Sequence, residues 1–343
     1  MSSQPAPPAR LLVAIGGNAT HPENIEGTSI EQKAIAEQTA EALLPLALMD
    51  NELVITHGNG PVVGKILMRQ ALTRDRIAPM PLDICVAHSQ GGIAYLLMQA
   101  IENALRRADN ERHVACLLTQ VEVDGNDPAF ANPSKPVGPF FTEEEARKLS
   151  NEFDWLMKED AGRGWRHFVP SPKPRHIVDI SLVRVLARRG TIVIAGGGGG
   201  IPVVRGPKGE RHGVAAVIDK DLTSAHMANV LGIDTMMILT AVRKVAVHWG
   251  TPDQRDLDQA TMSELKAWRA EGHFPPGSMG PKIDAAIRFL EGGGRDVIIA
   301  HIDEALPALQ GRAGTRIVAT GDGDDAAAVS GLAAVMGNAE NGA

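Results

Sequence analysis

Short apolar runs recur along the chain, and each is followed by glycine or polar residues and then by a helical spacing of apolar positions. The runs are residues 11–15, 53–56, 113–121, 191–195, 235–240 and 296–300. This alternation predicts strands separated by helices, as in βαβ units. Because parallel strands need such crossover helices, the pattern indicates an α/β fold on a mostly parallel sheet.

Two of the expected helices carry a recognisable start signal. Thr28 with Glu31, and Thr142 with Glu145, stand at the spacing of a capping box before several helical turns. We therefore expect helices to begin at both places and to cover the sheet with their apolar faces.

Two proline- and glycine-containing stretches, residues 124–141 and 160–174, interrupt the strand-helix rhythm. We expect an irregular excursion here. A long insertion in a compact domain is usually functional, so we interpret it as a lid or a substrate-facing subdomain. A surface loop without a role is the alternative.

The chain is expected to divide into lobes that share one sheet. We predict a disordered N-terminus at residues 1–10, a first lobe at 11–190 with a protruding subdomain at about 124–175, a second lobe at 191–318 and a flexible tail at 319–343. The tail is rich in Gly, Asp, Ala and Asn, which is typical of weakly ordered chain.

Composition supports the α/β interpretation and excludes several classes of function. Hydrophobic residues make up 44% of the 343 residues but aromatic residues only 3%, which suits helices packed on a parallel sheet. The net charge of −7 argues against nucleic acid as the main partner. Cys85 and Cys116 lack metal-ligand spacing and are expected to fill the core.

No secretory signal and no run of about 18 uncharged apolar residues is recognisable in the sequence. We therefore expect a cytoplasmic protein that has no membrane partner.

Glycine and asparagine follow the first two strand-like runs. Gly16, Gly17 and Asn18 follow the first run, and Gly58 and Asn59 follow the second. Ligands of open α/β sheets bind at the carboxyl ends of the strands, where glycine lets backbone N–H groups approach an anion. Each loop alone is consistent with a tight turn, but two similar loops indicate an anion site.

Five consecutive glycines, residues 196–200, follow the fourth run. They imply a close backbone approach, with a flexible turn as the alternative. Pro202 follows where a dinucleotide-binding motif would need a helix, so that motif is disfavoured. The stretch around Lys65 has only three residues between Gly60 and Gly64 and is not a phosphate-binding P-loop, so we interpret Lys65 as a helix-surface residue.

Three lysines stand in unusual surroundings. Lys220 lies where an apolar run gives way to a helix, Lys282 opens a helix after a glycine- and proline-containing turn, and Lys135 lies inside the proline-rich stretch. Phosphoryl transfer requires positive charge around the transferred group, which lysines supply. Each lysine taken singly is also consistent with an ordinary solvated residue.

Aspartates flank Lys220, and two histidines lie near segments expected to form the site. Asp219 and Asp221 are candidates for capping the next helix, orienting Lys220, or holding Mg²⁺ or ribose hydroxyls. No Ser/His/Asp or Cys/His arrangement for nucleophilic catalysis stands out in the sequence. We expect His57 and His88 to be neutral residues that donate to the backbone.

Over residues 11–318 the chain resembles the carbamate kinases of the amino acid kinase superfamily. The resemblance is carried by AIGGNA, THGNGPVVG, TQVEVDGNDPAFANPSKPVGPFF, DAGRGW, VPSPKP, GGGGIPVV, AVIDKDL, LTAV and EGHFPPGSMGPK, in that order. The segments GGIAYLL, HFPPGSM and LEGGG are similar to those of a less typical, carbamate kinase-like branch.

The resemblance implies a three-layer αβα sandwich, usually a homodimer, that transfers a phosphoryl group between MgATP and carbamate. It implies a nitrogen- or arginine-catabolic enzyme running toward ATP. The residues implied to bind the acid and the phosphoryl group are Gly17, Asn18, Gly58 and Asn59. The residues implied to act in transfer are Lys135, Lys220, Asp221 and Lys282, and those implied along the nucleotide are Gly198, Gly199, Asp221, Met279 and Lys282. The protein itself is expected to supply no dedicated metal site, because Mg²⁺ comes with the nucleotide.

Two positions differ from the usual motifs, Thr20 after GGNA and Gly125 before Asn126. They leave open an alternative: a related phosphotransferase that acts on another small carboxylate or carbamate-like acid. A nucleotide or metabolite sensor without catalysis is a third hypothesis, and the presence of all three lysines argues against it.

Overall fold

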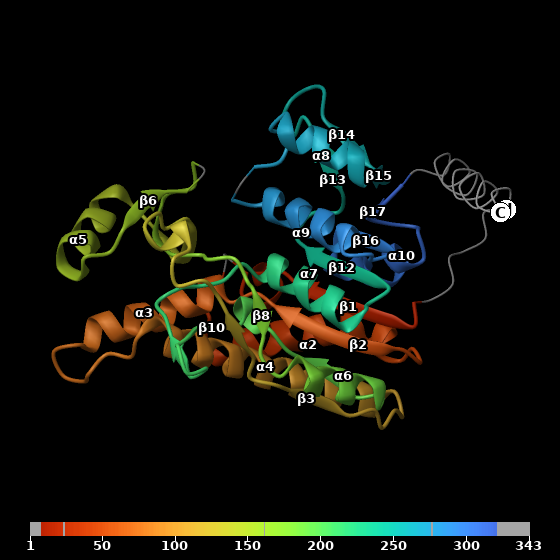
Figure 1. The fold of residues 1–343 in the computed structure, drawn as a ribbon, viewed down its shortest axis with the longest axis horizontal. Coiled ribbons are helices and arrows are strands. Elements are labelled where there is room, and N and C mark those ends of the chain that lie inside the picture. The colour runs from red at the N-terminus through yellow and green to blue at the C-terminus, as the bar shows by residue number, and fades with distance from the viewer. Residues whose placement is uncertain (1–7, 23–24, 161, 276, 321–343) are drawn as a thin grey trace, which may run out of the picture.

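An eight-stranded, mostly parallel sheet forms the centre of the protein (Figure 1). The structure is a computed structural model that describes residues 8–22, 25–160, 162–275 and 277–320. The strand order is β15-β17-β16-β12-β1-β2-β9-β3, and within it β17 runs antiparallel to β16. The strands are β1 (Arg10–Ile15), β2 (Glu52–His57), β3 (Val114–Cys116), β9 (Ile192–Ile194), β12 (Thr235–Thr240), β15 (Gln259–Thr261), β16 (Asp296–His301) and β17 (Thr315–Val318).

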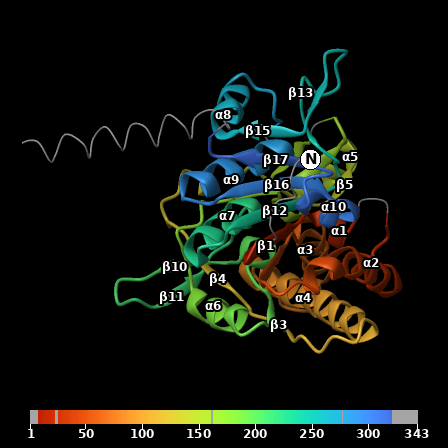
Figure 2. The same ribbon diagram turned by 90° about the vertical axis from the view of Figure 1, so that its right-hand side faces the viewer.

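Helices cover both faces of this sheet, which confirms the predicted three-layer αβα sandwich (Figure 2). One face packs against α6 (Ile180–Arg188), α7 (Lys220–Leu231), α8 (Met262–Ala270) and α9 (Met279–Glu291). The other face packs against α2 (Ser29–Ala47), α4 (Leu82–Arg107) and α10 (Ala305–Leu309). The short α1 (Gly17–Thr20) and the longer α3 (Gly60–Thr73) follow β1 and β2.

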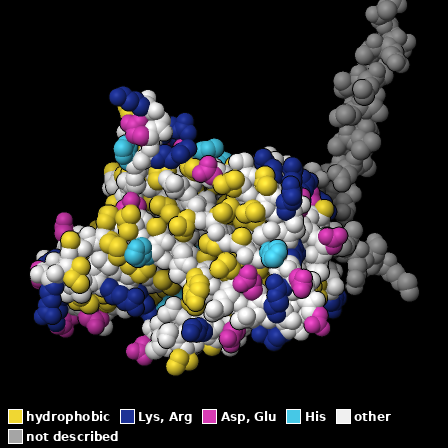
Figure 3. Space-filling model, turned by 90° about the horizontal axis from the view of Figure 1, so that it is seen from below, with side chains coloured by type: hydrophobic (Ala, Val, Ile, Leu, Met, Phe, Trp, Pro, Cys, Tyr) yellow, Lys and Arg dark blue, Asp and Glu magenta, His cyan; other side chains and the backbone are white. Residues whose placement is uncertain are grey.

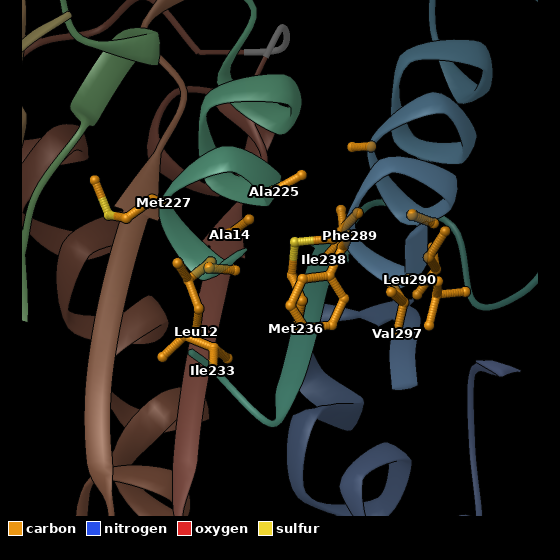
Figure 4. Packing of buried hydrophobic residues seen from close by; sticks show 14 of the residues in the cluster. Leu12, Ala14, Ala225, Met227, Ile233, Met236, Ile238, Phe289, Leu290 and Val297 are labelled. Carbon is orange, nitrogen blue, oxygen red and sulfur yellow. The ribbon is translucent and has the colours of Figure 1, made fainter. Parts of the chain in front are cut away.

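Alternate residues of each central strand point to opposite layers. In β1, Leu12 and Ala14 join the core under α7 and α9, whereas Leu11, Val13 and Ile15 join the core under α2 and α4. All five side chains are fully buried. Figure 4 shows the first of these cores, in which Met236 and Ile238 of β12 lie beside Phe289 of α9. Burial on both faces explains why these strands read as continuous apolar runs rather than as alternating ones.

Five of the six predicted strands are confirmed, and both predicted capping boxes are present at Thr28 and Thr142. The run 113–121 is wrong as a single strand. It splits into β3 and β4 (Gln120–Glu122), which belong to different sheets. The chain leaves the main sheet after Leu117, whose N–H donates to Ile194 O, and reaches the second sheet at Thr119, whose carbonyl accepts from Ile201 N.

A second sheet has the order β11-β10-β4-β8, and β13 (Val245–Val247) with β14 (Arg255–Leu257) forms a separate hairpin. The remaining strands of the second sheet are β8 (His176–Ile177), β10 (Ile201–Arg205) and β11 (Arg211–Gly213). Cys85 is buried, Cys116 is half-buried, and neither forms a disulfide.

A small subdomain stands out from the body of the protein (Figure 1). It contains the antiparallel sheet β5-β7-β6 and the helix α5, so the expected irregular excursion is wrong as to local structure. The elements are η1 (Pro128–Phe130), β5 (Lys135–Phe141), α5 (Glu143–Phe153), β6 (Met157–Glu159) and β7 (Trp165–Val169). Prolines concealed β5 in the sequence, yet they are tolerated because β5 is an edge strand with an irregular register between Val137 and Phe141.

The subdomain is attached to α3 through two contacts. At Gly64 the helix approaches β5 so closely that an added Cβ would lie 2.0 Å from Gly138 Cα. Further along, Arg74 donates to Glu152 O and lies over the Phe153 ring, 4.7 Å from its centroid. The first contact fixes the position of the strand that begins with Lys135.

Helix α4 is long and apolar enough, by length and composition alone, to cross a membrane. Half of its most apolar 18-residue window is nevertheless buried in the protein, against α2 and the sheet. This is the pattern of a core helix.

Replacing Gly64 with alanine should destabilise the protein, because the new methyl group would meet the backbone of β5. We expect a loss of about 1–3 kcal/mol in the free energy of unfolding, more than alanine gains in helix propensity. Gly92→Ala is the matched control, since a Cβ at this helical glycine has no neighbour within 4 Å. Urea unfolding of both variants checks this, and equal stability of the two would contradict the contact.

Candidate active site

A deep cleft of about 1120 Å³ lies at the carboxyl ends of the central strands, between the body and the subdomain. Most of the residues predicted to bind or transfer a phosphoryl group line it. They are Gly17, Gly58, Asn59, Lys135, Gly198, Lys220, Asp221 and Lys282. Residues separated by more than 200 positions in the sequence therefore meet in one place, as the strand order requires.

The loops after β1 and β2 touch each other backbone to backbone. Gly16 N donates to Leu239 O at 2.8 Å, and Gly58 N donates to Ile15 O at 3.0 Å, so both loops continue the hydrogen bonding of the sheet. A Cβ on Gly58 would lie 2.9 Å from Gly17 N. The two glycines thus form one continuous rim at the floor of the cleft.

Asn59 follows this rim as the residue before α3. Its side chain is 3% exposed and does not cap the helix. Instead its Nδ2 donates to Ser89 Oγ of α4 at 2.8 Å, which fixes the side chain at the helix N-terminus. Asn18 lies in α1 by its backbone, but its side chain is outside the described part of the structure.

The five-glycine loop is a compact turn rather than a flexible one. Gly196, Gly198, Gly199 and Gly200 all have positive φ, which glycine adopts without the steric cost that a Cβ brings. A Cβ on Gly198 would also lie 2.2 Å from Asn59 Nδ2. The loop therefore packs directly under the loop that follows β2.

Hydrogen bonds from α4 and α7 hold this turn. Gln90 Nε2 donates to Gly197 O at 2.7 Å, and Thr223 Oγ1 of α7 donates to Gly199 O at 2.8 Å. Gly198 lines the cleft, whereas Gly199 is buried beneath it and does not.

Asp219 caps α7 and binds the subdomain at the same time. Its Oδ1 accepts from Asp221 N at 2.9 Å and from Leu222 N at 3.2 Å, while its Oδ2 accepts from Lys135 Nζ at 2.6 Å. Capping, one of the predicted roles, thus belongs to Asp219 and not to Asp221. The ion pair raises the pKa of Lys135, overcoming the opposite effect of burial, so this lysine is charged in the cleft.

Asp221 lies between two lysines. Lys220 Nζ is 2.6 Å from Asp221 Oδ1, and Lys282 Nζ is 3.6 Å from Asp221 Oδ2. Burial alone would raise the pKa of the Asp221 carboxyl, but the charges of Lys220, Lys282 and Lys135 outweigh it and lower the pKa well below its usual range. Burial lowers the pKa of Lys220, and the carboxylate of Asp221 counteracts this effect.

Long helices point their N-termini into the cleft. α3 and α9 begin at Gly60 and Met279, and neither preceding residue, Asn59 or Ser278, caps its helix with its side chain. The positive ends of the two helix dipoles favour an anion at this end of the sheet. Lysines, backbone donors and helix dipoles together create a site suited to phosphate.

Two predicted positions, one expected beside the nucleotide and one beside the acid, do not lie on the cleft wall. Met279 begins α9 but packs against the core below it, and it is not among the residues that line the cleft. Gly125, expected near the acid, is exposed and contacts Val204 on the second sheet, so that expectation is wrong.

Several charged residues of the cleft were missed from the sequence. Arg163 and Arg166 of the subdomain line it, and both lie over the Phe140 ring, 4.8 and 5.0 Å from its centroid. Arg166 also donates to Gly138 O at 2.8 Å. Lys65, interpreted as a surface residue, lines the cleft too. The DAGRGW motif contained Arg163, but nothing local in the sequence indicated its direction.

Neither of the two histidines predicted near the site lines the cleft. His57 is fully buried beneath Gly197, and burial lowers its pKa to about 4. It is therefore neutral at pH 7, as predicted, with its Nδ1 3.1 Å from Gly58 O. His88 is exposed on α4 and does not line the cleft.

Asp221→Asn should destabilise the protein by about 3–5 kcal/mol at pH 7, because the buried Lys220 and the half-buried Lys282 would lose their shared counter-charge. The folded-state pKa of Asp221 is lowered, so its contribution is complete above the unfolded-state pKa near 4 and is lost as the pH falls below that value. The difference between variant and wild type should thus shrink below about pH 4. Urea unfolding at several pH values measures this, and a pH-independent difference would contradict it.

Comparison with known proteins agrees with this site. The model of the amino acid kinase family matches residues 9–301. A carbamate kinase of Thermococcus kodakarensis is 47% identical over 312 residues, covering 90% of this chain and 99% of that protein. The carbamate kinase-like protein YahI of Escherichia coli is 45% identical over 314 residues, with the same coverage of both chains.

Solved structures give the same result. The carbamate kinase of Giardia lamblia bound to citric acid has a TM-score of 0.86 at 38% identity, covering 90% of this chain and 98% of that chain. The same enzyme bound to AMP-PNP has a TM-score of 0.82 at 40% identity, with the same coverage. Sequence, fold and cleft agree that the chain belongs to the carbamate kinases of the amino acid kinase family and is a phosphotransferase enzyme.

Proposed function

We propose that the protein catalyses reversible phosphoryl transfer between MgATP and carbamate, giving MgADP and carbamoyl phosphate. The observation that carries this is the meeting of Lys135, Lys220 and Lys282 with the two glycine loops in one cleft. A relative with the same fold binds AMP-PNP, which supports a nucleotide in this cleft.

The two ends of the cleft take different parts of the reaction. Gly17, Asn18, Gly58 and Asn59 bind the acid and the transferred group, and Lys135 reaches carbamoyl phosphate from the subdomain. Lys220 and Lys282 bridge the phosphates, with Asp221 orienting Lys220. Gly198 lies along the nucleotide, whereas Gly199 and Met279 lie behind the cleft wall and support the loop and the start of α9 from there. The Lys135–Asp219 ion pair, which joins subdomain to α7, supports this division.

The division of the cleft into an acid end and a nucleotide end corresponds to two lobes of the chain. Residues 11–190 form the acid- and phosphoryl-binding lobe, with the protruding subdomain at about 124–175, and residues 191–318 form the nucleotide lobe. Both lobes contribute strands to the central sheet, so the reactants meet across their junction.

The transfer needs no general base. A carbamate oxygen is already anionic; it attacks the γ-phosphorus in line as the bond from phosphorus to the β,γ-bridging oxygen breaks, and ADP leaves. The chain's contribution is position and charge: lysines and backbone N–H groups neutralise the oxygens of the group in transfer. The neutral, buried His57 is consistent with this mechanism.

Mg²⁺ enters with the nucleotide, as part of the substrate. Mg²⁺ is commonly held by phosphates with only one or two carboxylates. Asp219 and Asp221 already pair with lysines, which supports metal binding chiefly through the nucleotide.

We further propose that the enzyme works in the cytoplasm and makes ATP from carbamoyl phosphate in nitrogen or arginine catabolism. Thr20, which differs from the usual motif, lies beside the proposed acid site: its hydroxyl donates to Gly17 O at 2.9 Å. Close analogues of carbamate should therefore be tested as substrates too. The citric acid bound by the Giardia enzyme supports including other carboxylates in that test.

We also propose a homodimer formed through α4. Tyr95 and Leu118 are 54% and 64% exposed, and Leu118 lies against Gly91 one helical turn from Tyr95. Figure 3 shows hydrophobic side chains gathered on the side of the molecule where α4 and β3 lie, and β3 is an edge strand. A contiguous apolar face beside an open sheet edge is typical of an interface.

Sedimentation velocity should give about twice the chain mass of 36.4 kDa. Tyr95→Glu should shift the protein to monomer by placing a charge in the apolar interface. Trp249→Glu, at a 60% exposed residue after β13, is the control. A monomeric wild type would contradict the proposal.

The reaction itself is tested by coupling ATP formation to a reporter enzyme, with ADP, Mg²⁺ and carbamoyl phosphate as substrates. We expect saturable turnover, and Lys220→Ala should lower kcat by about 10²–10³-fold, because one buried charge on the transferred group is lost. ADP binding should weaken much less. Lys208→Ala, in an exposed turn, should behave as wild type.

Two results would oppose this account. Wild-type turnover no faster than the spontaneous breakdown of carbamoyl phosphate would exclude carbamate as the acid. Saturable ADP release from MgATP with a different carboxylate, in the absence of activity on carbamate, would favour the alternative acid.

A further inference from the structure

The cleft continues past the glycine loops to a second basic group. His21, Pro22, Ile25 and Lys65 line this end of it, beside Gly58 and Pro61. Neither the transfer of the phosphoryl group nor the nucleotide site uses His21 or Lys65. Their chemistry is that of an anion site, so the question is which anion they serve.

Lys65 belongs to the helix that begins at the glycine rim. It lies one turn after Pro61 on the same face of α3, about 6 Å further along the axis. Helical side chains lean toward the N-terminus, which directs Lys65 back toward the loop after β2. Its Nζ donates to Glu26 O at 2.5 Å and lies 2.8 Å from His21 Nε2.

The charge of Lys65 differs from that of the other cleft lysines in having no acidic partner. Each of the three others lies within 4.0 Å of Asp219 or Asp221. Over the described residues, no carboxylate lies within that distance of Lys65, and its two partners are a carbonyl and an imidazole. Among the described residues, Glu31 and Glu26 act on Lys65 without a direct ion pair, so its ammonium group is not tied to a carboxylate as the other three are.

His21 fixes this lysine. The imidazole is 3% exposed, and burial together with the charge of Lys65 lowers its pKa, so it is neutral at pH 7. A neutral Nε2 that accepts from the ammonium group leaves the proton on Nδ1. That nitrogen is buried and, in the part of the chain that is described, has no hydrogen-bond partner.

We propose that Lys65, positioned by His21, binds the acid substrate: a small carboxylate or carbamate monoanion held between the α3 N-terminus and the Lys65 ammonium group. This rests on the proposed function, because it assigns the acid to the glycine-rim end of the cleft. The helix dipole and the lysine act on the same anion from one helix. Helix α3 therefore selects for negative charge and also sets how far the acid lies from the phosphoryl group.

The test compares KM values in the coupled assay. Lys65→Met should raise the KM for carbamoyl phosphate, and for carbamate in the reverse direction, by about 10–100-fold, the range expected for loss of a charged hydrogen bond. The KM for ADP and ATP should change less than about twofold. A purely structural role would instead alter stability and all KM values together.

Variants of two neighbours make the test specific. Lys65→Arg should recover part of the acid affinity. His21→Gln, which keeps an acceptor near the Nε2 position, should be milder than His21→Phe. Arg69→Met removes a charge one turn further along α3, outside the cleft lining, and should leave the KM for the acid unchanged. Equal KM values for wild type and Lys65→Met would overturn the proposal.

A readout without turnover separates this inference from the reaction. Calorimetric titration with phosphonoacetate, which carries a carboxylate and a phosphonate, should show at least about tenfold weaker binding to Lys65→Met than to wild type and Arg69→Met. If that difference appears but wild type makes no ATP, the proposed reaction fails while the anion site stands. If ATP forms normally and the difference is absent, the anion site fails alone.

Discussion

The contact of Asp221 with Lys220 and Lys282 is the interaction on which the site depends. It places two cations and one anion at the N-termini of α7 and α9, where burial would otherwise discourage any charge. The two helices can bring these groups together because they pack side by side on the same face of the sheet, over Leu12, Met236 and Ile238. A buried core thus fixes the charges that the chemistry requires.

Close backbone contact is the second constraint. The rim formed by Gly17 and Gly58, the turn at Gly198 and the crossing of Gly64 over Gly138 all leave no room for a side chain. The first two form the floor of the cleft, and the third holds the subdomain so that Lys135 reaches Asp219. The glycines therefore position both walls of the cleft, not only its floor.

The sequence predicted the strands and lysines of this site better than it predicted which side chains contact each other. Apolar runs ending in glycine predicted the central strands, and motif positions predicted the three lysines. That Lys135 meets Asp219, 84 residues away, follows only from how the subdomain docks on α3. Lys65 was interpreted as a surface residue because spacing alone does not reveal which face of a helix borders a cleft, and prolines concealed β5. Local patterns encode elements, whereas such contacts arise from packing.

The central claim is that Asp221 keeps two lysines charged around the transferred group. The pH dependence of kcat for ATP formation, in wild type and in Asp221→Asn, tests it most directly. Because burial lowers the pKa of Lys220 and Asp221 opposes this, the alkaline limb of the variant should move to lower pH. Superimposable alkaline limbs, with only the height of the profile changed, would contradict the account.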